Sequence, residues 1–495
     1  MRRAQELELA LGRRPPQTTR QRWLYEEIRN AILSGRLARA ARLPASRDLA
    51  RQYDLARGTV LAVYDQLSAE GYVAGHIGRG TFVAPSLPEV RMQPASPPPG
   101  ASIPSKLSQR GVLLARTIFP VDGHAQPQRA FRPSQPDLRA FPVELWRRLS
   151  GRRARLANAA LLASGPAMGY RPLQEAIAEH LRGSRGISCS ANHVAIIGSV
   201  QQALDLCARL LLDPGDRVWL EEPGYTGARL VFEAAGAKVV PVPVDDDGLQ
   251  VEVAIRRAPS AKLAYVTAGR QAPLGVTLSL DRRLALLAWA SRSGATIIED
   301  DYDSEFRFTG HPLAAMKSLD TGGHVVYAGT FSKFLFPALR LAYLVLPERL
   351  VEPFAAAHSL TARHAPILSQ AILADFIGEG HFGRHIRRMR MLYAERAMAL
   401  QAALGRHMSG PLDVPPITAG LDTPAFFTAP RDDRAIAKAA LAIGIETRPL
   451  SDFWLQARGR AGLQLGFACV GVREIQAGVA QLGRLIASTG ALRGR

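Results

Sequence analysis

A lysine in the second half of the chain stands among residues that could bind a phosphate. Lys333 follows Thr330 and Ser332, and Arg340 comes seven residues later. A lysine amine can form an imine with an aldehyde, hydroxyl groups can donate to phosphate oxygens, and a guanidinium can hold a phosphate through two parallel hydrogen bonds. The alternative is a surface lysine in a loop. The combination predicts that pyridoxal 5'-phosphate binds here through Lys333.

Three further side chains could hold the aromatic ring of this cofactor. Asp300 follows a predicted strand, where a buried carboxylate is costly unless it meets a cation such as a protonated pyridine nitrogen. Tyr302 could bind the ring hydroxyl, and Tyr225, which follows another predicted strand, could stack on the ring. The alternatives are a solvated acidic cluster at a strand end and a tyrosine of the core.

A cradle for the phosphate is predicted where a strand meets the next helix. Ser199, Val200 and Gln201 follow the predicted strand Val194–Ile197 and open a helix. The first amides of a helix have no partner within it and bind anions well. The position of this glycine-serine turn, ahead of Tyr225, Asp300 and Lys333 in the chain, supports its assignment to the phosphate site.

The elements that must position these residues alternate between strand and helix. Short apolar runs are predicted as buried strands, with helical patterns such as Gln201–Leu212 and Asp281–Ser291 between them. The predicted strands are Val194–Ile197, Arg217–Leu220, Lys238–Val242, Leu263–Thr267, Thr296–Glu299 and His324–Ala328. This alternation predicts an α/β domain with a mostly parallel sheet and helices on both faces.

The first 84 residues follow a different pattern. A helix with Leu24, Ile28 and Ile32 on one face is followed by a short helix that Ser46 could cap. A third helix is predicted from about 57 to 70, and a hairpin follows, with its return strand at 78–83. These elements describe a winged helix-turn-helix, an α+β module that binds DNA. The alternative is a three-helix domain with a solvated basic face.

The third helix is expected to enter the major groove of DNA by its N-terminal end. Arg57 and Thr59 can reach base edges and phosphates there, and Arg79 in the hairpin can enter the adjacent groove. The residues expected to contact DNA are Arg42, Ser46, Arg47, Arg57, Gly58, Thr59, Arg79 and Gly80.

The charge of the chain is compatible with a polyanionic partner. The 495 residues carry a net charge of +19, and residues 1–85 hold 14 Arg against 8 Asp or Glu. Cys189, Cys207 and Cys469 cannot form a disulfide framework and fit a reducing compartment. No apolar run approaches the roughly 20 residues of a membrane helix, and a signal-peptide pattern is lacking. We therefore expect a cytoplasmic protein with no metal site and no membrane contact.

Composition divides the chain into three parts. Residues 1–84 form the predicted DNA-binding module, and residues 85–127, rich in proline and serine, are predicted to be a partly extended linker. Residues 128–495 form the predicted α/β domain, with a large subdomain at about 160–370 and a small subdomain mainly at 380–495.

Motifs in both modules resemble those of one group of bacterial regulators. LYEEIRNAILSGRL, RLPASRDLA and GRGTFV resemble the DNA-binding domain of the GntR family. FRPSQPDLRAFPVELWRRL, IIEDDYDSEFRF and GTFSKFLFPALRLAYLV resemble a fold-type I, aspartate aminotransferase-like domain. Their order is similar to that of the MocR subfamily of GntR regulators. The resemblance implies a head-to-tail homodimer with pyridoxal phosphate as an internal aldimine on Lys333. It also implies that Asp300 pairs with the ring nitrogen and that Thr330 and Arg340 hold the phosphate.

Three positions of the α/β domain depart from that family's pattern in ways that bear on a ligand. Arg270 stands where a histidine usually faces the cofactor ring, and it would add positive charge near the ring hydroxyl or bind a substrate carboxylate. Cys469 stands where aminotransferase-like members can carry the arginine for the substrate α-carboxylate, and Asp422 stands where histidine is frequent.

Other departures concern phosphate and DNA contacts. Ser199 replaces a glycine, and Ser164 replaces a tyrosine that reaches the phosphate of the neighbouring subunit. In the DNA-binding module, Ala45 and Ala56 stand where serine is common, and a lost helix cap costs about 1 kcal/mol.

These observations lead to one principal hypothesis and two alternatives. We expect a ligand-responsive transcription regulator that binds an operator in double-stranded DNA and senses pyridoxal phosphate itself or an amino compound that displaces Lys333. The first alternative is an active aminotransferase with an appended DNA-binding domain, which Cys469 argues against and Arg270 could favour. The second is a DNA-binding scaffold whose pocket has decayed. The aminotransferase-like domain is thus expected to serve sensing rather than turnover.

Overall fold

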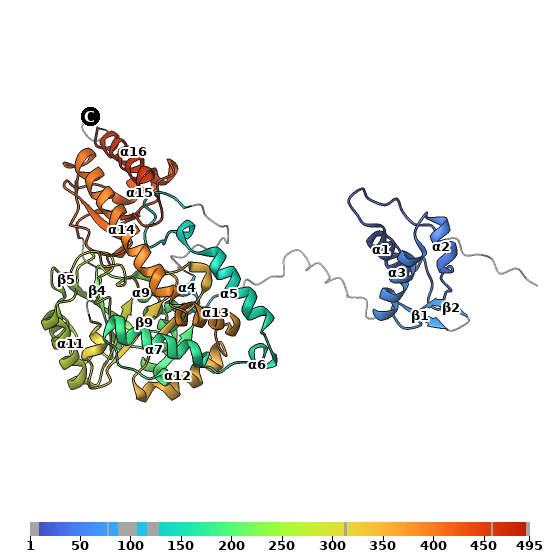
Figure 1. Ribbon diagram of the computed structural model, residues 1–495, viewed down its shortest axis with the longest axis horizontal. Coiled ribbons are helices and arrows are strands. Elements are labelled where there is room, and N and C mark those ends of the chain that lie inside the picture. The colour runs from blue at the N-terminus through green and yellow to red at the C-terminus, as the bar shows by residue number, and fades with distance from the viewer. Residues whose placement is uncertain are drawn as a thin grey trace, which may run out of the picture. The chain divides into compact units, whose positions relative to one another are not determined.

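The chain folds into two compact units. The computed structural model describes residues 9–76, 79–87, 106–115, 128–310, 314–456 and 459–491. The N-terminal unit ends at Lys106, and the C-terminal unit begins at Leu107 (Figure 1). This division falls within the predicted linker, most of which lies outside the described residues.

Three helices and a hairpin make up the described part of the N-terminal unit (Figure 1). The helices are α1 (Arg20–Leu33), α2 (Ser46–Gln52) and α3 (Arg57–Ala69), and the strands are β1 (Val73–His76) and β2 (Gly80–Val83). The two strands pair antiparallel, and Arg42 bridges to Phe82. The core includes Leu24, Ile28, Leu49, Val63 and Leu67, all fully buried. The predicted winged helix-turn-helix is confirmed.

The two helices of the helix-turn-helix begin without a side-chain cap. α2 follows Ala45 and α3 follows Ala56, and neither residue has a side chain that accepts an amide hydrogen. The prediction that Ser46 caps α2 is wrong, because Ser46 is the first residue of that helix. Its hydroxyl instead accepts from Nε of Arg57 at 3.5 Å.

An eight-stranded sheet forms the centre of the C-terminal unit, in the order β3-β10-β9-β8-β7-β4-β5-β6. The neighbours from β9 to β5 run parallel, whereas β10 and the edge strand β6 run antiparallel to their neighbours. The strands are β3 (Val194–Ile197), β4 (Arg217–Glu222), β5 (Lys238–Asp245), β6 (Gly248–Leu249), β7 (Leu263–Val266), β8 (Thr296–Asp301), β9 (Val325–Thr330) and β10 (Ala342–Val345). The mostly parallel sheet is confirmed, while β10 was not expected.

Helices cover both faces of this sheet, as the alternation of buried residues along β4 shows. Val218 and Leu220 pack with α8 and α9, whereas Trp219 faces the opposite layer and stacks on Trp289 of α11 at 3.7 Å. The helices of this part are α5 (Val143–Arg155), α6 (Ala159–Leu162), α7 (Arg171–Arg185), α8 (Val200–Leu211), α9 (Thr226–Ala234), α10 (Val251–Arg257), α11 (Leu280–Ser293), α12 (Glu348–Thr361) and α13 (Ile367–Gly378). Short 3-10 turns lie at Leu138–Ala140, Ala191–His193, Met316–Leu319, Pro337–Leu339 and Leu450–Phe453.

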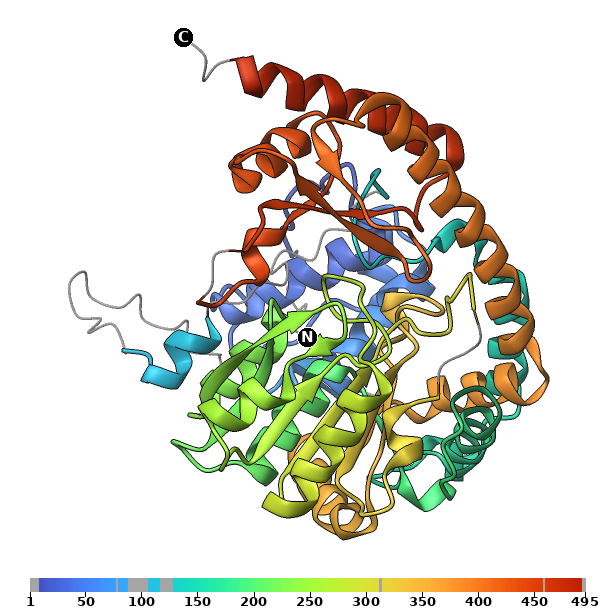
Figure 2. The same ribbon diagram turned by 90° about the vertical axis from the view of Figure 1, so that its left-hand side faces the viewer.

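A second, antiparallel sheet builds a smaller subdomain (Figure 2). Its order is β11-β12-β14-β13, and its strands are β11 (Leu412–Asp413), β12 (Asp422–Phe427), β13 (Arg448–Pro449) and β14 (Gly462–Gly466). Helices α14 (His381–His407), α15 (Asp433–Ala442) and α16 (Val472–Ala491) belong to the same subdomain. Phe131 bridges to Gly466, so the residues that follow the predicted linker lie beside β14.

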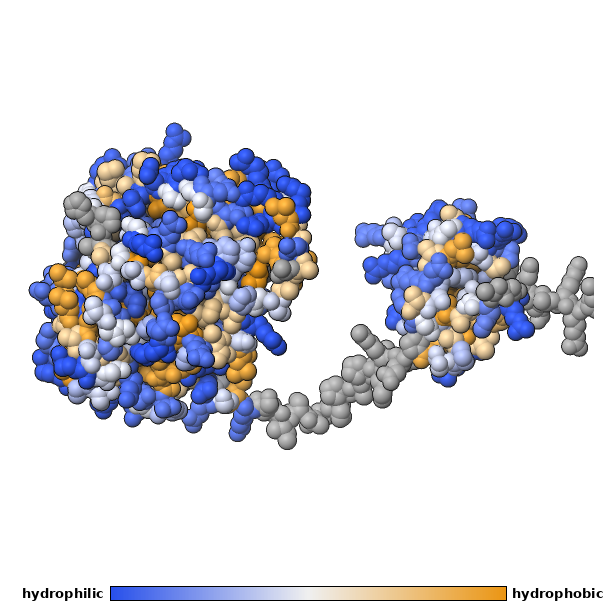
Figure 3. Space-filling model, turned by 60° about the horizontal axis from the view of Figure 1, so that its bottom comes forward, coloured by the Kyte–Doolittle hydropathy of each residue, from blue (hydrophilic) through white to orange (hydrophobic). Residues whose placement is uncertain are grey.

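The predicted linker contains one described helix. α4 (Gln109–Leu114) begins after Ser108, whose hydroxyl accepts from the amide of Gly111, and it packs against α9. The proline content of 85–127 did not indicate this helix. The visible face of each unit mixes hydrophilic residues with smaller apolar groups (Figure 3). Among the described residues, no helix combines the length and the apolar character needed to cross a membrane.

Candidate functional site

A cavity of about 540 Å³ gathers most of the predicted cofactor-binding residues. Those that line it are Ser199, Val200, Gln201, Tyr225, Asp300, Tyr302, Thr330, Lys333 and Arg340. Asp300 and Thr330 lie at the carboxyl ends of β8 and β9, and Ser199 follows β3 after one residue, Gly198. The carboxyl ends of parallel strands meet at one edge of a sheet, which is where such folds bind ligands.

Asp300 carries a buried oxygen that accepts no hydrogen bond from the residues described by the structure. Its Oδ2 accepts from the hydroxyl of Tyr265 at 2.6 Å, whereas its Oδ1 has no hydrogen-bond partner among the described residues. Burial raises the pKa of Asp300 to about 7. An orphaned carboxylate oxygen in a cavity calls for a cationic donor, and a protonated pyridine nitrogen meets that requirement.

Lys333 reaches the same cavity from the turn after β9. Its Nζ donates to the backbone carbonyl of Ser134 at 2.7 Å. Burial lowers the pKa of the Lys333 amine, and the carboxylates of Asp422, Asp303 and Asp300 oppose that shift. A lowered pKa increases the fraction of neutral amine, the form that attacks an aldehyde.

The phosphate end of the predicted site is also assembled. Ser199 caps α8, and its hydroxyl accepts from the amide of Gln202 at 3.1 Å, so the amides of Val200 and Gln201 lie at the open end of the helix. Arg340 adopts a left-handed conformation with φ of 51°, and its side chain lines the cavity with Thr330. These donors fit a phosphate group.

Two predicted cofactor contacts lie outside the cavity lining. Ser332 does not line it, although its amide donates to Oγ1 of Thr330 at 3.1 Å and so fixes the turn. Arg270 is buried behind Tyr302. Its Nη1 donates to Oδ2 of Asp303 at 3.0 Å and to Oδ1 of Asp422 at 3.3 Å.

Arg270 is therefore committed to protein partners. Burial alone would lower the pKa of its guanidinium, but Asp303 and Asp422 raise it, so Arg270 stays charged. Burial also raises the pKa of Asp303, to about 7, while Arg270 opposes this. Arg270 was expected to add positive charge near the ring hydroxyl or to take a substrate carboxylate; the structure directs its donors to Asp303, Asp422 and Tyr302 and leaves it outside the cavity lining.

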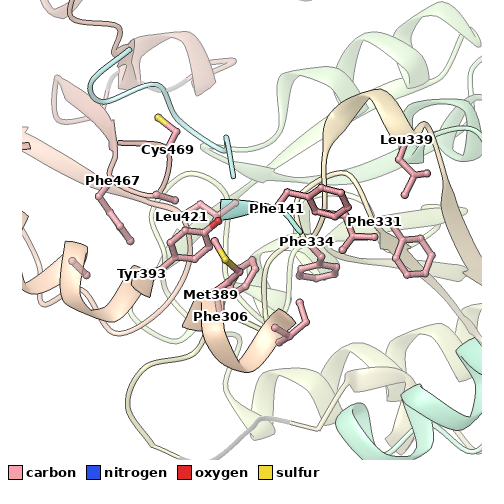
Figure 4. Close-up of a cluster of buried hydrophobic side chains, with 14 of the residues drawn as sticks. Phe141, Phe306, Phe331, Phe334, Leu339, Met389, Tyr393, Leu421, Phe467 and Cys469 are labelled. Atoms are coloured by element: carbon pink, nitrogen blue, oxygen red, sulfur yellow. The ribbon is translucent and has the colours of Figure 1, made fainter. Parts of the chain in front are cut away.

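Cys469 is likewise absent from the cavity. It belongs to the hydrophobic cluster that links the two subdomains (Figure 4), and its Sγ donates to the carbonyl of Arg129 at 3.3 Å. The neighbouring strand β14 instead sends Gln464 into the cavity lining. The expectation that position 469 faces a ligand therefore does not match the cavity lining. Ser164, the other departure near the phosphate, is exposed.

Several lining residues were not expected from the sequence. They are Ser134, Tyr265, Thr267, Ala272, Arg448, Phe453 and Gln464. Tyr265 and Thr267 lie in the predicted strand Leu263–Thr267, and Ser134 lies in the motif FRPSQPDLRAFP, so the sequence held features that could have indicated these three residues. Nothing in the sequence around Arg448 or Phe453 indicated a site.

Arg448 is a charged residue of the cavity lining that was not predicted from the sequence. Its guanidinium lies 4.3 Å from the centre of the Phe453 ring, and its strand places it opposite Gln464. It makes no hydrogen bond or ion pair with the residues that the structure describes, and burial lowers its pKa. A half-buried guanidinium with unused donors in a cavity is suited to an anionic group of a ligand.

The residues expected to contact DNA gather around the helix-turn-helix and the hairpin. Arg42, Arg47, Arg57, Gly58, Arg79 and Gly80 are exposed, whereas Ser46 and Thr59 are half-buried. Arg57 and Ser46 bring the first turns of α3 and α2 together, and the guanidinium of Arg42 lies against Gly80 in the hairpin. This surface offers four arginines to a polyanion.

The fold and the cavity define a protein that joins a DNA-binding domain to an aminotransferase-like domain. Residues 20–83 match the family described as bacterial regulatory proteins of the gntR family, and residues 136–438 match aminotransferase class I and II. The probable rhizopine catabolism regulatory protein MocR of Rhizobium meliloti is 41% identical over 93% of this chain and 92% of its own length. The chain belongs to the MocR subfamily of GntR transcription regulators.

Two further comparisons support this assignment. The pyridoxine biosynthesis transcriptional regulator PdxR of Corynebacterium glutamicum is 30% identical over 93% of this chain and 94% of its own length. The α-aminoadipate aminotransferase LysN of Thermus thermophilus, solved with N-(5'-phosphopyridoxyl)-L-leucine, matches with a TM-score of 0.67 and 27% identity, covering 73% of this chain and 92% of LysN. The C-terminal unit thus has the fold of a pyridoxal phosphate-dependent family.

Proposed function

We propose that this regulator binds pyridoxal 5'-phosphate through Lys333 and changes its affinity for an operator when the ligand state of the cavity changes. The unpartnered Oδ1 of Asp300 carries the proposal, because a buried carboxylate oxygen without a donor is costly unless a ligand supplies one. Bound pyridoxal phosphate would supply an aldehyde that captures amines and a ring that withdraws electrons.

Different residues of the cavity would bind the ring and the phosphate of the cofactor. Asp300 would accept from the ring nitrogen, and Tyr225 and Tyr302 would contact the ring. Thr330, Arg340 and the first amides of α8 would hold the phosphate. The lowered pKa of Lys333 keeps more of its amine neutral and able to condense with the aldehyde.

The effector is proposed to be an amino compound with an acidic group, or pyridoxal phosphate itself. Arg448 offers the cavity a guanidinium without a protein partner, which favours a carboxylate on the amine. The PdxR relative is named as a regulator of pyridoxine biosynthesis, which supports pyridoxal phosphate itself as the second candidate effector. Gln464 in the lining and the engagement of Arg270 favour sensing over aminotransferase turnover.

The assembly and the compartment are part of the same proposal. Because aminotransferase relatives are typically dimers, we infer a homodimer with the head-to-tail arrangement that the subfamily implies. Two winged helices in such a dimer would bind two half-sites of one operator in double-stranded DNA. A cytoplasmic location follows from a DNA target and from three free, buried cysteines.

The test compares full-length protein with and without pyridoxal 5'-phosphate. Borohydride reduction followed by mass spectrometry should place one cofactor on Lys333, and Lys333→Ala should lose it while Lys238→Ala, a change at an exposed lysine, keeps it. Titration of operator DNA should then show a shift of about 1–3 kcal/mol between ligand states. Absence of any attached cofactor would remove the proposal, and attachment without a change in DNA affinity would remove the sensing part of it.

A further inference from the structure

The Lys333 amine forms a hydrogen bond with the first described stretch that follows the predicted linker. Its Nζ donates to the carbonyl oxygen of Ser134 at 2.7 Å. Ser134 lies only seven residues after residue 127, the end of that linker, and its stretch bridges to the small subdomain through Phe131 and Gly466. The group that would carry the cofactor therefore contacts the part of the chain that leads towards the DNA-binding module.

This stretch has a backbone that depends on its contacts. Ser134 has φ of 55° and Phe131 has φ of 67°. The left-handed region is unfavourable for a residue with a side chain, so it persists only where surrounding contacts hold it. For Ser134 these contacts are the amine of Lys333 and the carboxylate of Asp422. Oδ2 of Asp422 accepts from the amide of Ser134 at 2.8 Å and from its hydroxyl at 2.9 Å.

Asp422 is in turn held from the large subdomain. Its Oδ1 accepts from both terminal nitrogens of Arg270 at 3.3 Å, and Arg270 also donates to Asp303 and to the hydroxyl of Tyr302. Asp422, Arg270 and Asp303 are all buried. Ser134 is thus hydrogen-bonded both to Lys333 and to this buried ionic cluster.

We propose that Ser134 is a positioning residue for the Lys333 amine, and that the stretch 130–137 responds to whether this amine is free or bonded to the cofactor. The inference rests on the proposed attachment of pyridoxal phosphate. When the neutral amine condenses with the aldehyde, a C=N bond forms, and both amine hydrogens leave with the aldehyde oxygen as one water. The nitrogen then has at most one hydrogen, gained by protonation, and that hydrogen is confined to the plane of the C=N bond.

The carbonyl of Ser134 consequently loses its donor when the bond forms. The left-handed turn is then held by Asp422 alone, and its local opening becomes more frequent. An amine effector that takes over the aldehyde would return the free lysine and restore the contact. A ligand that occupies the cavity without a covalent bond to Lys333 leaves the hydrogen bond between Lys333 and Ser134 in place. This difference distinguishes the inference from a general effect of ligand binding on the stretch 130–137.

Hydrogen exchange of the full-length protein tests the idea. Peptides that span 130–137 should exchange several-fold faster with pyridoxal 5'-phosphate than without it. Pyridoxamine 5'-phosphate, which has an amine in place of the aldehyde, should leave them protected. Lys333→Met and Lys333→Ala should show the faster exchange without any cofactor and no response to it, whereas Lys238→Ala should behave as the unchanged protein.

Visible absorbance and borohydride labelling of the same samples report whether the cofactor has become attached. Attachment accompanied by unchanged or slower exchange at 130–137 would overturn the role of Ser134 and leave the proposed function standing. Failure of attachment in the unchanged protein would overturn both. Protection of 130–137 in both lysine variants would also overturn the role of Ser134, since the contact would then contribute nothing.

Discussion

Arg270 and Asp422, 152 positions apart in the sequence, form a buried ion pair near Lys333. In the pattern of the MocR subfamily, histidine is usual at the position of Arg270 and frequent at the position of Asp422. The structure shows that the two departures are one contact, in which an arginine and an aspartate replace two imidazoles and tie the large subdomain to the small one. A buried charge is costly without a partner of opposite charge, so we expect Arg270 and Asp422 to occur together in place of the two histidines.

The pair should show strong coupling in a double-mutant cycle. Arg270→His and Asp422→His should each lower the free energy of unfolding of the C-terminal unit by about 3–5 kcal/mol, because each leaves a buried charge short of a partner. The double variant should recover about 1–3 kcal/mol of the summed loss. Denaturant unfolding of the full chain measures these values. The exposed pair Arg434–Asp452 serves as the control and should couple by less than about 1 kcal/mol. Additive losses at positions 270 and 422 would contradict the interpretation.

Asp300 should make the stability of the cofactor-free protein depend on pH. Its pKa is about 7 in the folded protein, against an ordinary value of 3.8. Between these values the folded state holds a proton that the unfolded state has lost, so the free energy of unfolding falls as pH rises. The slope from this group is about 1.4 kcal/mol per pH unit.

Asp300→Asn should remove this contribution. Denaturant unfolding between pH 5 and 7 should show a shallower fall for the variant than for the unchanged protein, although Glu221 and Asp303, with raised pKa values, contribute to both. Saturating pyridoxal phosphate should reduce the difference, because a pyridinium partner favours the ionised carboxylate. Identical slopes in the two proteins would show that Asp300 does not titrate in this range.

Arg448 should decide which amines act as effectors. Arg448→Gln should weaken the response to amines that carry a carboxylate by about 1.5–3 kcal/mol, since a hydrogen bond to a charged group is lost. Its response to the matching amines without an acidic group should stay the same. Operator titrations with paired amines, such as an amino acid and its decarboxylated form, measure this difference. An equal loss for both members of a pair would assign Arg448 a structural role.

The recognition helix should gain stability from a cap. Ala56→Ser gives α3 an N-cap hydroxyl that it lacks and should raise the stability of the N-terminal unit by about 1 kcal/mol. Calorimetry of the full chain should show the shift in the transition of that unit and none in the other. Ala56→Val provides a control without hydrogen-bonding capacity. Equal stability of the serine and valine variants would contradict the capping argument.

Arg57 should contribute directly to operator binding. Arg57→Ala should weaken binding by about 1–3 kcal/mol if the side chain reaches a base edge, and should reduce the preference for the operator over random DNA. Arg22, an exposed arginine of α1 paired with Glu26, supplies the control substitution. A loss that is equal on operator and random DNA would place Arg57 on a phosphate. An unchanged affinity would exclude it from the interface.

Local patterns carried much of the information about the fold. Apolar runs such as Leu263–Thr267 and Thr296–Glu299 predicted buried strands, because strands covered on both faces need continuous apolar side chains. β10 was not predicted, because its antiparallel place between β3 and β9 depends on distant partners. The cap of α2 was misplaced by one residue for a similar reason, since Ser46 and Ala45 differ in role only through their backbone geometry.

The chemical groups that converge on the cavity could be predicted from local sequence patterns. Lys333, Asp300 and Arg340 lie close to the ends of strands, and a parallel sheet brings those ends to one edge whatever the details of packing. The surroundings of Arg270 and Arg448, in contrast, depend on how distant segments pack. A long guanidinium side chain can point into a cavity or away from it, and the choice depends on carboxylates and aromatic rings supplied by segments far along the chain, such as Asp422 and Phe453. Such partners meet only when the two subdomains pack together, and for that reason local sequence could not reveal them.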